Sequence, residues 1–171
     1  MRSRFLPEGR LLHTPENEAA CASCDGLRRA MEEETVLEGV AQLCDGAHNL
    51  LVSVGPFTGF LPREEAALGI AEGTTREIAI LSRVGKPVCF QITALEESEG
   101  VLRPRLSRRR AQQAALDAML AGLHPGCILP AVVTHLESFG AFVDIGCGVP
   151  SLIGIENISV SRIPHPDQRF R

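Results

Sequence analysis

Aromatic side chains able to stack on a nucleic-acid base are few in this sequence, and two of them stand close together. Seven Phe are the only aromatic residues of the chain, because Trp and Tyr are absent. Phe139 and Phe142 open a run that alternates apolar residues through Ile145. If the odd-numbered residues of this strand face a core, Phe142 points outward together with Asp144. An outward ring can stack on an unpaired base, with about 1–3 kcal/mol per base; the alternative is that Phe142 packs beneath a loop.

Phe139 stands at the turn before this strand. Counting along the strand places it with the inward-facing, odd-numbered residues. The residues alone therefore leave Phe139 open between a core position and a place on the stacking surface.

Cationic side chains that could pair with phosphate gather before and within a predicted helix. Five Arg fall within eight residues: Arg103, Arg105, Arg108, Arg109 and Arg110. Arg pairs with phosphate or stacks on bases, and cations at a helix start oppose the helix dipole. The cluster therefore favours an anionic partner, although a solvated strand end and helix start would look the same. Arg162 and Arg169 are weaker candidates of the same kind.

The charge of the chain is distributed unevenly in a way that agrees with this cluster. The formal net charge is −4. Residues 103–171 carry 8 Arg and 5 Asp or Glu, a net charge of +3, whereas the preceding 102 residues carry −7. The C-terminal part is therefore the part expected to face a polyanion.

The elements that must position these residues are mainly strands, because apolar residues recur mainly at every second position. Strands are predicted at 35–43, 50–54, 57–61, 88–95 and 101–106, with a turn at Asp45-Gly46. Pro62 opens a short helix after the third strand, and 73–85 is a further amphipathic stretch. Five short strands with a helix after the third describe a five-stranded OB-type barrel. Before them, one helix is predicted over 22–33, with Ser23 or Asp25 as its N-cap.

After the fifth strand the pattern starts again. Ser107 is the predicted N-cap of a helix over 108–121, which Gly122 ends. Strands then follow at 128–136, 139–145 and 149–153. The separation from strand start to glycine turn is 19 residues from Val36 to Gly55 and 18 from Ile128 to Gly146, which indicates an internal repeat.

We therefore predict a mainly β protein with two five-stranded OB-fold barrels in tandem, joined by a helix. By the length of the first unit, the second is expected to stop after about three strands, which would leave strand edges exposed. The predicted parts are an N-terminal extension at 1–34, the first barrel at 35–110, a linker helix at 107–124 and the second unit at 126–171.

The sequence of the second unit resembles a known family. Its run Phe139-Gly-Ala-Phe-Val-Asp-Ile-Gly146 resembles the most specific part of the S1 RNA-binding domain, and the first unit is similar to a diverged copy. The segments 84–88 and 106–109 resemble the pattern that closes this domain. Across most of its length the chain is similar to clostridial-type homologues of the small-subunit ribosomal protein S1.

The resemblance implies an S1-type OB fold and a non-catalytic, cytoplasmic bacterial protein that binds single-stranded RNA or mRNA in translation. It also implies the small ribosomal subunit as a candidate partner, and no cofactor. It places Phe139 at the RNA surface beside Phe142. The expected RNA-binding residues are Phe139, Phe142, Arg108, Arg109, Arg110 and Arg162. Gly154 stands where the family often has His, and Ser151 stands where Gly is usual, so weaker binding is expected.

Other functions have less support in the sequence. A zinc module could use the spacing of four candidate ligands, Cys21, Cys24, Cys44 and His48. The sequence has no second Cys-x-x-Cys pair, so we expect no metal. The sequence shows neither a nucleophile–base pair at a recognisable spacing nor a phosphate-binding glycine loop, so an enzyme is not expected. A signal peptide and a membrane span are not expected either. The main alternative is a protein-interaction module, since the first unit lacks paired aromatics.

Overall fold

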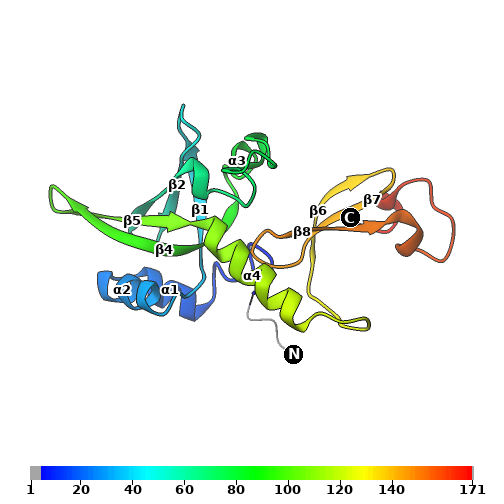
Figure 1. The fold of residues 1–171 in the computed structure, drawn as a ribbon, viewed down its shortest axis with the longest axis horizontal. Coiled ribbons are helices and arrows are strands. Elements are labelled where there is room, and N and C mark those ends of the chain that lie inside the picture. The colour runs from blue at the N-terminus through cyan, green and yellow to red at the C-terminus, as the bar shows by residue number, and fades with distance from the viewer. Residues whose placement is uncertain (1–4, 171) are drawn as a thin grey trace.

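The computed structural model describes residues 5–170 and contains two β-sheets (Figure 1). Residues 1–4 and 171, which belong to the predicted N-terminal extension and second unit, lie outside the described residues. The first sheet is a closed barrel of five strands in the order β1-β2-β3-β5-β4. Its strands are β1 (Leu37–Cys44), β2 (Leu50–Val54), β3 (Phe57–Leu61), β4 (Pro87–Ser98) and β5 (Val101–Ser107). The predicted mainly β fold with a five-stranded barrel is confirmed.

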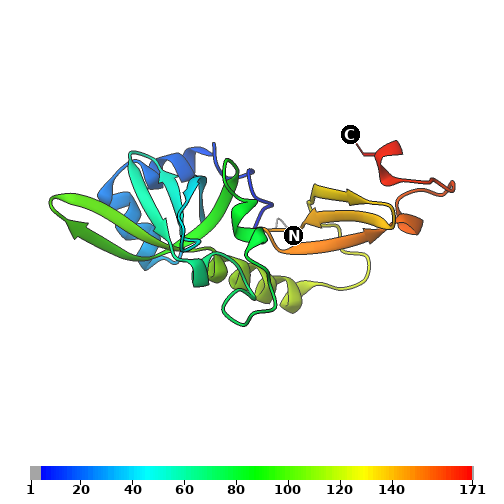
Figure 2. The ribbon, with the colours of Figure 1, turned by 90° about the horizontal axis from the view of Figure 1, so that it is seen from above.

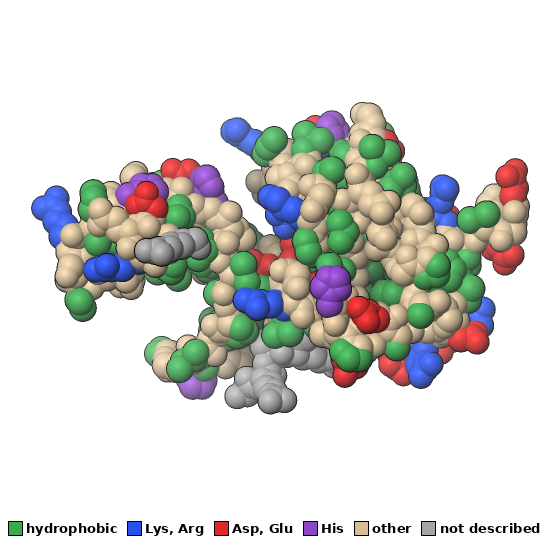
Figure 3. All heavy atoms as spheres, turned by 180° about the vertical axis from the view of Figure 1, so that it is seen from behind, with side chains coloured by type: hydrophobic (Ala, Val, Ile, Leu, Met, Phe, Trp, Pro, Cys, Tyr) green, Lys and Arg blue, Asp and Glu red, His purple; other side chains and the backbone are tan. Residues whose placement is uncertain are grey.

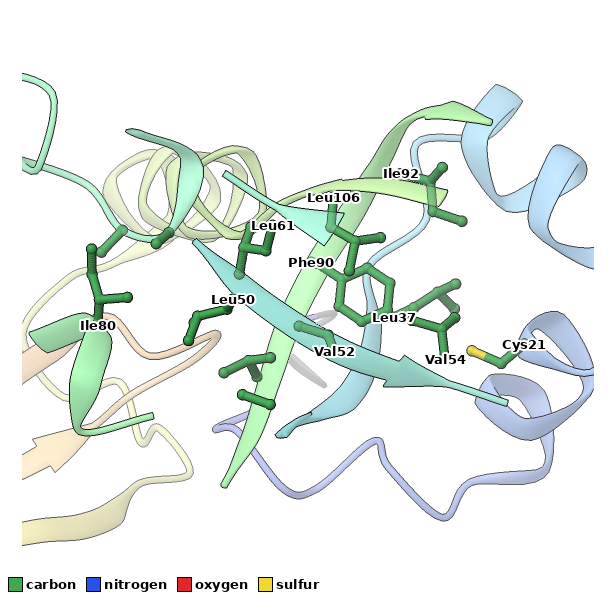
Figure 4. Close-up of a cluster of buried hydrophobic side chains, with 14 of the residues drawn as sticks. Cys21, Leu37, Leu50, Val52, Val54, Leu61, Ile80, Phe90, Ile92 and Leu106 are labelled. Carbon is green, nitrogen blue, oxygen red and sulfur yellow. The ribbon is translucent and has the colours of Figure 1, made fainter. Parts of the chain in front are cut away.

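Apolar side chains that alternate with other residues along the strands form the core of this barrel. Leu50, Val52 and Val54 are fully buried on one face of β2 and meet Phe90 of β4 and Leu106 of β5 (Figure 4). The turn between β1 and β2 is held by Asp45, whose carboxylate accepts hydrogen bonds from the backbone of two residues within the turn. β3 pairs in parallel with β5 at Phe60 and Arg105, and the other strand pairs are antiparallel.

Two helices precede the barrel, where the sequence predicted one. They are α1 (Pro15–Cys21) and α2 (Cys24–Glu32). The predicted N-cap Ser23 is confirmed, since its hydroxyl accepts a hydrogen bond from the Gly26 N–H. The helix before it was missed, although Thr14 caps it and Pro15 occupies its first position, which is a regular start signal. Both helices lie beside the barrel (Figure 2).

Glu38 of β1 ties the N-terminal segment to the barrel. Its carboxylate is buried and accepts hydrogen bonds of 2.8–3.1 Å from the backbone N–H groups of Gly9, Leu11 and Leu12. Asn17 of α1 holds the same strand from the other side. Its amide donates to the Glu38 carbonyl and its Oδ1 accepts from the Glu38 N–H, at 3.0 and 2.8 Å.

Glu38 makes stability depend on pH. Burial raises the pKa of Glu38 to about 7, although the three backbone donors lower it in part. In the unfolded chain this pKa is about 4.3. Between these values the folded state binds the proton and the unfolded state does not, so the free energy of unfolding falls as pH rises through this window and then levels off.

We expect Glu38→Gln to remove this dependence. Urea unfolding at pH 5 and pH 7.5 measures the free energy of unfolding of both proteins. Relative to the variant, the wild type should lose on the order of 2 kcal/mol of stability between the two conditions. Glu97→Gln, at an exposed position of β4, is the control and should follow the wild type. Parallel pH curves for Glu38→Gln and wild type would contradict the prediction.

Helix α4 (Arg108–Gly122) follows β5 directly and runs toward the second sheet (Figures 1 and 2). The predicted cap is confirmed, because Ser107 Oγ accepts a 3.0 Å hydrogen bond from the Arg110 N–H. In the loop after β3, the short helix predicted after Pro62 is the 3-10 turn η1 (Arg63–Glu65). The predicted amphipathic stretch at 73–85 contains the single-turn helix α3 (Ile78–Leu81).

The second sheet has three antiparallel strands in the order β6-β7-β8. They are β6 (Val132–Glu137), β7 (Gly140–Asp144) and β8 (Pro150–Gly154). The first starts four residues later than predicted, because Ile128 lies in an exposed segment rather than in a strand. After β8 the chain passes through the 3-10 turns η2 (Ile155–Asn157) and η3 (Pro166–Gln168), and Ile163 and Pro166 are buried.

Within the described residues, no helix is both long enough and apolar enough to cross a membrane.

Candidate functional site

Three rings form a row on the outer face of the second sheet. Phe142 lies half-buried in the middle of β7, and Phe139, just before the strand, is 53% exposed. Their ring centroids are 6.1 Å apart in an edge-to-face arrangement. His135 of β6 is paired with Phe142 across the strands and stacks on it, with centroids 6.4 Å apart and planes inclined by 28°. We call Phe139, Phe142 and His135 the aromatic stripe.

The structure thus brings Phe139 and Phe142 together and adds His135, which was not predicted. A β-bulge in β6 between Val133 and His135 shifts the register. Val133 pairs with Val143, and simple alternation would next pair Thr134 with Phe142; the bulge brings His135 there instead. Because a single sequence does not reveal the bulge, strand counting could not place His135 in the site.

A neighbouring carboxylate orients the histidine ring. His135 Nε2 lies 2.7 Å from Glu137 Oε1; the His135 side chain is largely exposed and that of Glu137 is half-buried. Leu152 of β8, paired with Phe142 on its other side, is also exposed. Rings held in this way offer π-faces to unpaired bases, whatever the base.

The predicted outward position of Asp144 on β7 is wrong. Alternation placed it beside Phe142, but the structure buries it to 5% exposure. Its carboxylate accepts hydrogen bonds from the N–H groups of Glu8, Gly146 and Gly148, at 2.7, 2.8 and 3.0 Å. Burial raises its pKa above the usual range. The N-terminal segment supplies the Glu8 donor, so Asp144 anchors chain segments together rather than facing solvent.

Arg108, predicted to contact RNA, is also buried. Its guanidinium forms two hydrogen bonds to the Glu8 carboxylate, at 2.6 and 2.9 Å, and a third to the Ala66 carbonyl. Arg83 reaches the same carboxylate at 2.8 Å. Burial alone would raise the pKa of Glu8, but these two guanidinium groups hold it below its ordinary value. We call Glu8, Arg83, Arg108 and Asp144 the Glu8 clasp; within it Arg108 is unavailable to phosphate.

The remaining Arg candidates are dispersed. Arg109 is half-buried and paired with Glu72. Arg110 and Arg162 are exposed, and within residues 5–170 neither forms an ion pair. In the same part of the chain, no ion pair or ring contact joins these three residues to the aromatic stripe. On the first barrel, the Arg105 guanidinium lies 6.0 Å from the Phe60 ring centroid.

The zinc alternative has no support in the fold. Cys21 points into the barrel core (Figure 4), where burial raises the pKa of its thiol to about 11. Cys24 is exposed at the start of α2. Among the residues that the structure describes, no three His, Cys, Asp or Glu side chains are grouped as metal ligands.

Comparison with known proteins gives small ribosomal subunit proteins bS1 as relatives. The small ribosomal subunit protein bS1 of Leuconostoc lactis is 30% identical over 134 residues, covering 78% of this chain and 29% of the relative. That of Mycobacterium tuberculosis H37Rv is 28% identical over 166 residues, covering 94% of this chain and 32% of the relative. The resemblance to the S1 family is confirmed. No family model matches the S1-like chain.

The S1-like chain is short beside these relatives. It spans 24% of bS1 from Neisseria meningitidis, to which it is 26% identical, and about a third or less of the two relatives above. The solution structure of GSP13 from Bacillus subtilis overlaps it with a TM-score of 0.34 and 19% identity, over 57% of this chain and 64% of that one. An overlap of that size does not establish a shared fold.

Proposed function

We propose that this chain is a non-catalytic, cytoplasmic RNA-binding protein of the S1 type that acts in translation. Its ligand is single-stranded RNA or mRNA, and the small ribosomal subunit is its candidate partner. The observation that carries the proposal is the ring pair of exposed Phe139 and half-buried Phe142, which lies in the motif that resembles the S1 domain. Unpaired bases stack on such rings, and a sequence-specific contact is not needed for binding.

We propose that cations supplement the stacking. Arg110 and Arg162 are exposed and free of ion pairs in the described chain, and Arg109 has only a surface pair with Glu72. Each can contact a phosphate when the RNA approaches, since a surface ion pair is weak and exchangeable. Arg108 leaves the proposed set because the Glu8 clasp holds it.

The division into units belongs to the same proposal. We infer two S1-type units in tandem, the barrel at 35–110 and the second unit at 126–171, with the helix at 107–124 between them. The five-stranded barrel, the helix that follows it and the three-stranded sheet support this division. The second unit carries the stacking surface for RNA, and the first has the half-buried Phe60 ring with the Arg105 guanidinium over it.

A protein-interaction module is the second candidate. The hairpin of β4 and β5 extends beyond the body of the barrel as an arm (Figure 1). Val101 near its tip is 63% exposed, and Glu97 and Glu99 make this tip acidic. An exposed apolar residue among like charges suits a protein partner better than RNA.

A fluorescence-anisotropy titration tests the proposed function. The wild-type chain is titrated against labelled single-stranded RNA at several salt concentrations. We expect binding whose affinity falls with salt, with a slope in log–log form of about 0.7 per phosphate contacted. Absence of binding at low salt would reject RNA as the ligand and favour the protein-interaction module.

A further inference from the structure

A cleft separates the barrel from the second sheet, and both contribute to its walls. Its volume is about 450 Å³. Figure 3 shows the molecule hollowed between the two parts. On the barrel side the cleft is lined by the loop that leads into β4, including Ser82 and Lys86. On the sheet side it is lined by Thr134 and His135 of β6.

His135 belongs both to the aromatic stripe and to the wall of this cleft. A strand whose bases stack along Phe139 and Phe142 therefore meets the mouth of the cleft when it passes His135. Resting on the proposed function, we propose that the RNA continues into this cleft and that Lys86 of the first barrel binds its phosphodiester there. The first barrel is then part of the RNA site rather than only a structural unit.

The charges around the cleft favour a phosphate. Its lining contains two carboxylates, Glu8 and Asp144, and three cations, Arg83, Arg108 and Lys86. The Glu8 charge is matched by the two Arg side chains that bind it, and Asp144 accepts three backbone hydrogen bonds. The excess cation is Lys86.

Lys86 is also the cation that is free to act. It is the only Lys of the sequence, it is exposed, and no ion pair holds it within residues 5–170. The hydroxyls of Ser82 and Thr134 already donate to the carbonyls of Ala79 and Phe142. Unlike Arg83 and Arg108, which bind Glu8, Lys86 supplies a cationic donor on this wall that no carboxylate engages. An ammonium group binds phosphate as a point charge.

The test compares Lys86→Gln with wild type on oligouridylates of 4 and 12 nucleotides. On this proposal the 4-mer occupies only the aromatic stripe, whereas the 12-mer extends beyond the stripe into the cleft. We expect Lys86→Gln to weaken binding of the 12-mer about three- to tenfold and to lower its salt slope by about 0.7, the value of one phosphate contact. Binding of the 4-mer should not change.

Arg76→Gln is the matched control, because it removes one exposed charge from the same loop outside the cleft. It should leave both RNAs unaffected. An unchanged affinity and salt slope of Lys86→Gln for the 12-mer would overturn the cleft proposal, while Phe142→Ala would still report on the stacking surface. If wild type binds neither RNA, the proposed function fails, and the cleft proposal fails with it.

Discussion

Arg108→Met lowers the free energy of unfolding by about 3–5 kcal/mol, because it leaves a carboxylate buried without its main partner. The side chains of Arg108 and Glu8 are only 6% and 4% exposed. Arg83 still binds one oxygen of Glu8 after the substitution, but both hydrogen bonds from Arg108 are lost. The Glu8 carboxylate is then held by Arg83 alone and lies near the buried carboxylate of Asp144, which binds the same N-terminal segment. Urea denaturation followed by circular dichroism at pH 7 measures the effect.

Arg110→Met is the control for this substitution. It lies two residues further along α4, is exposed and has no ion pair in the described chain, so we expect a change within about 0.5 kcal/mol. The double variant Glu8→Gln with Arg108→Met should recover part of the loss, since the buried charge is then removed together with its partner. A loss below about 1 kcal/mol for Arg108→Met would show that the clasp does not hold the fold together.

The Glu8 clasp also explains which parts of the site the sequence could not predict. Glu8 binds Arg108 across 100 residues of sequence and Asp144 across 136. Local rules placed Arg108 in an accessible cationic cluster that could contact RNA, and placed Asp144 on an outward face. Both inferences were wrong for one reason, since the N-terminal segment covers these residues, and no periodicity within a strand or helix reports such a long-range contact.

Features that depend on local chemistry were predicted well. The bounds of β3 were predicted to the residue, and Leu50, Val52 and Val54 are buried as the alternation required. Ser107 caps α4 as its type and position indicated. The bulge in β6 shows the limit of this reasoning. One extra residue in that strand changes which side chain lies beside Phe142, and the site gains His135 without a signal in the hydrophobic pattern.

Loss of the Phe142 ring should have the largest effect on RNA binding. Phe142 lies between Phe139 and His135 and contacts both rings, so its removal interrupts the aromatic stripe at its centre. At about 1–3 kcal/mol per stacked base, Phe142→Ala should weaken binding of single-stranded RNA by roughly 5- to 150-fold. Fluorescence anisotropy with the 12-nucleotide RNA measures this, and the salt slope should stay close to that of wild type because the phosphate contacts remain.

Two further variants separate stacking from packing. Phe142→Leu keeps an apolar side chain beside Leu152 but has no π-face, so it should lose nearly as much affinity as Phe142→Ala while folding as wild type does. Phe60→Ala removes an outer ring from the first barrel, where Arg105 lies over it, and should leave RNA affinity unchanged. If Phe142→Leu bound RNA as tightly as wild type, the ring would serve packing alone. If Phe60→Ala weakened binding as much as Phe142→Ala, the RNA surface would have to include the first barrel's outer face.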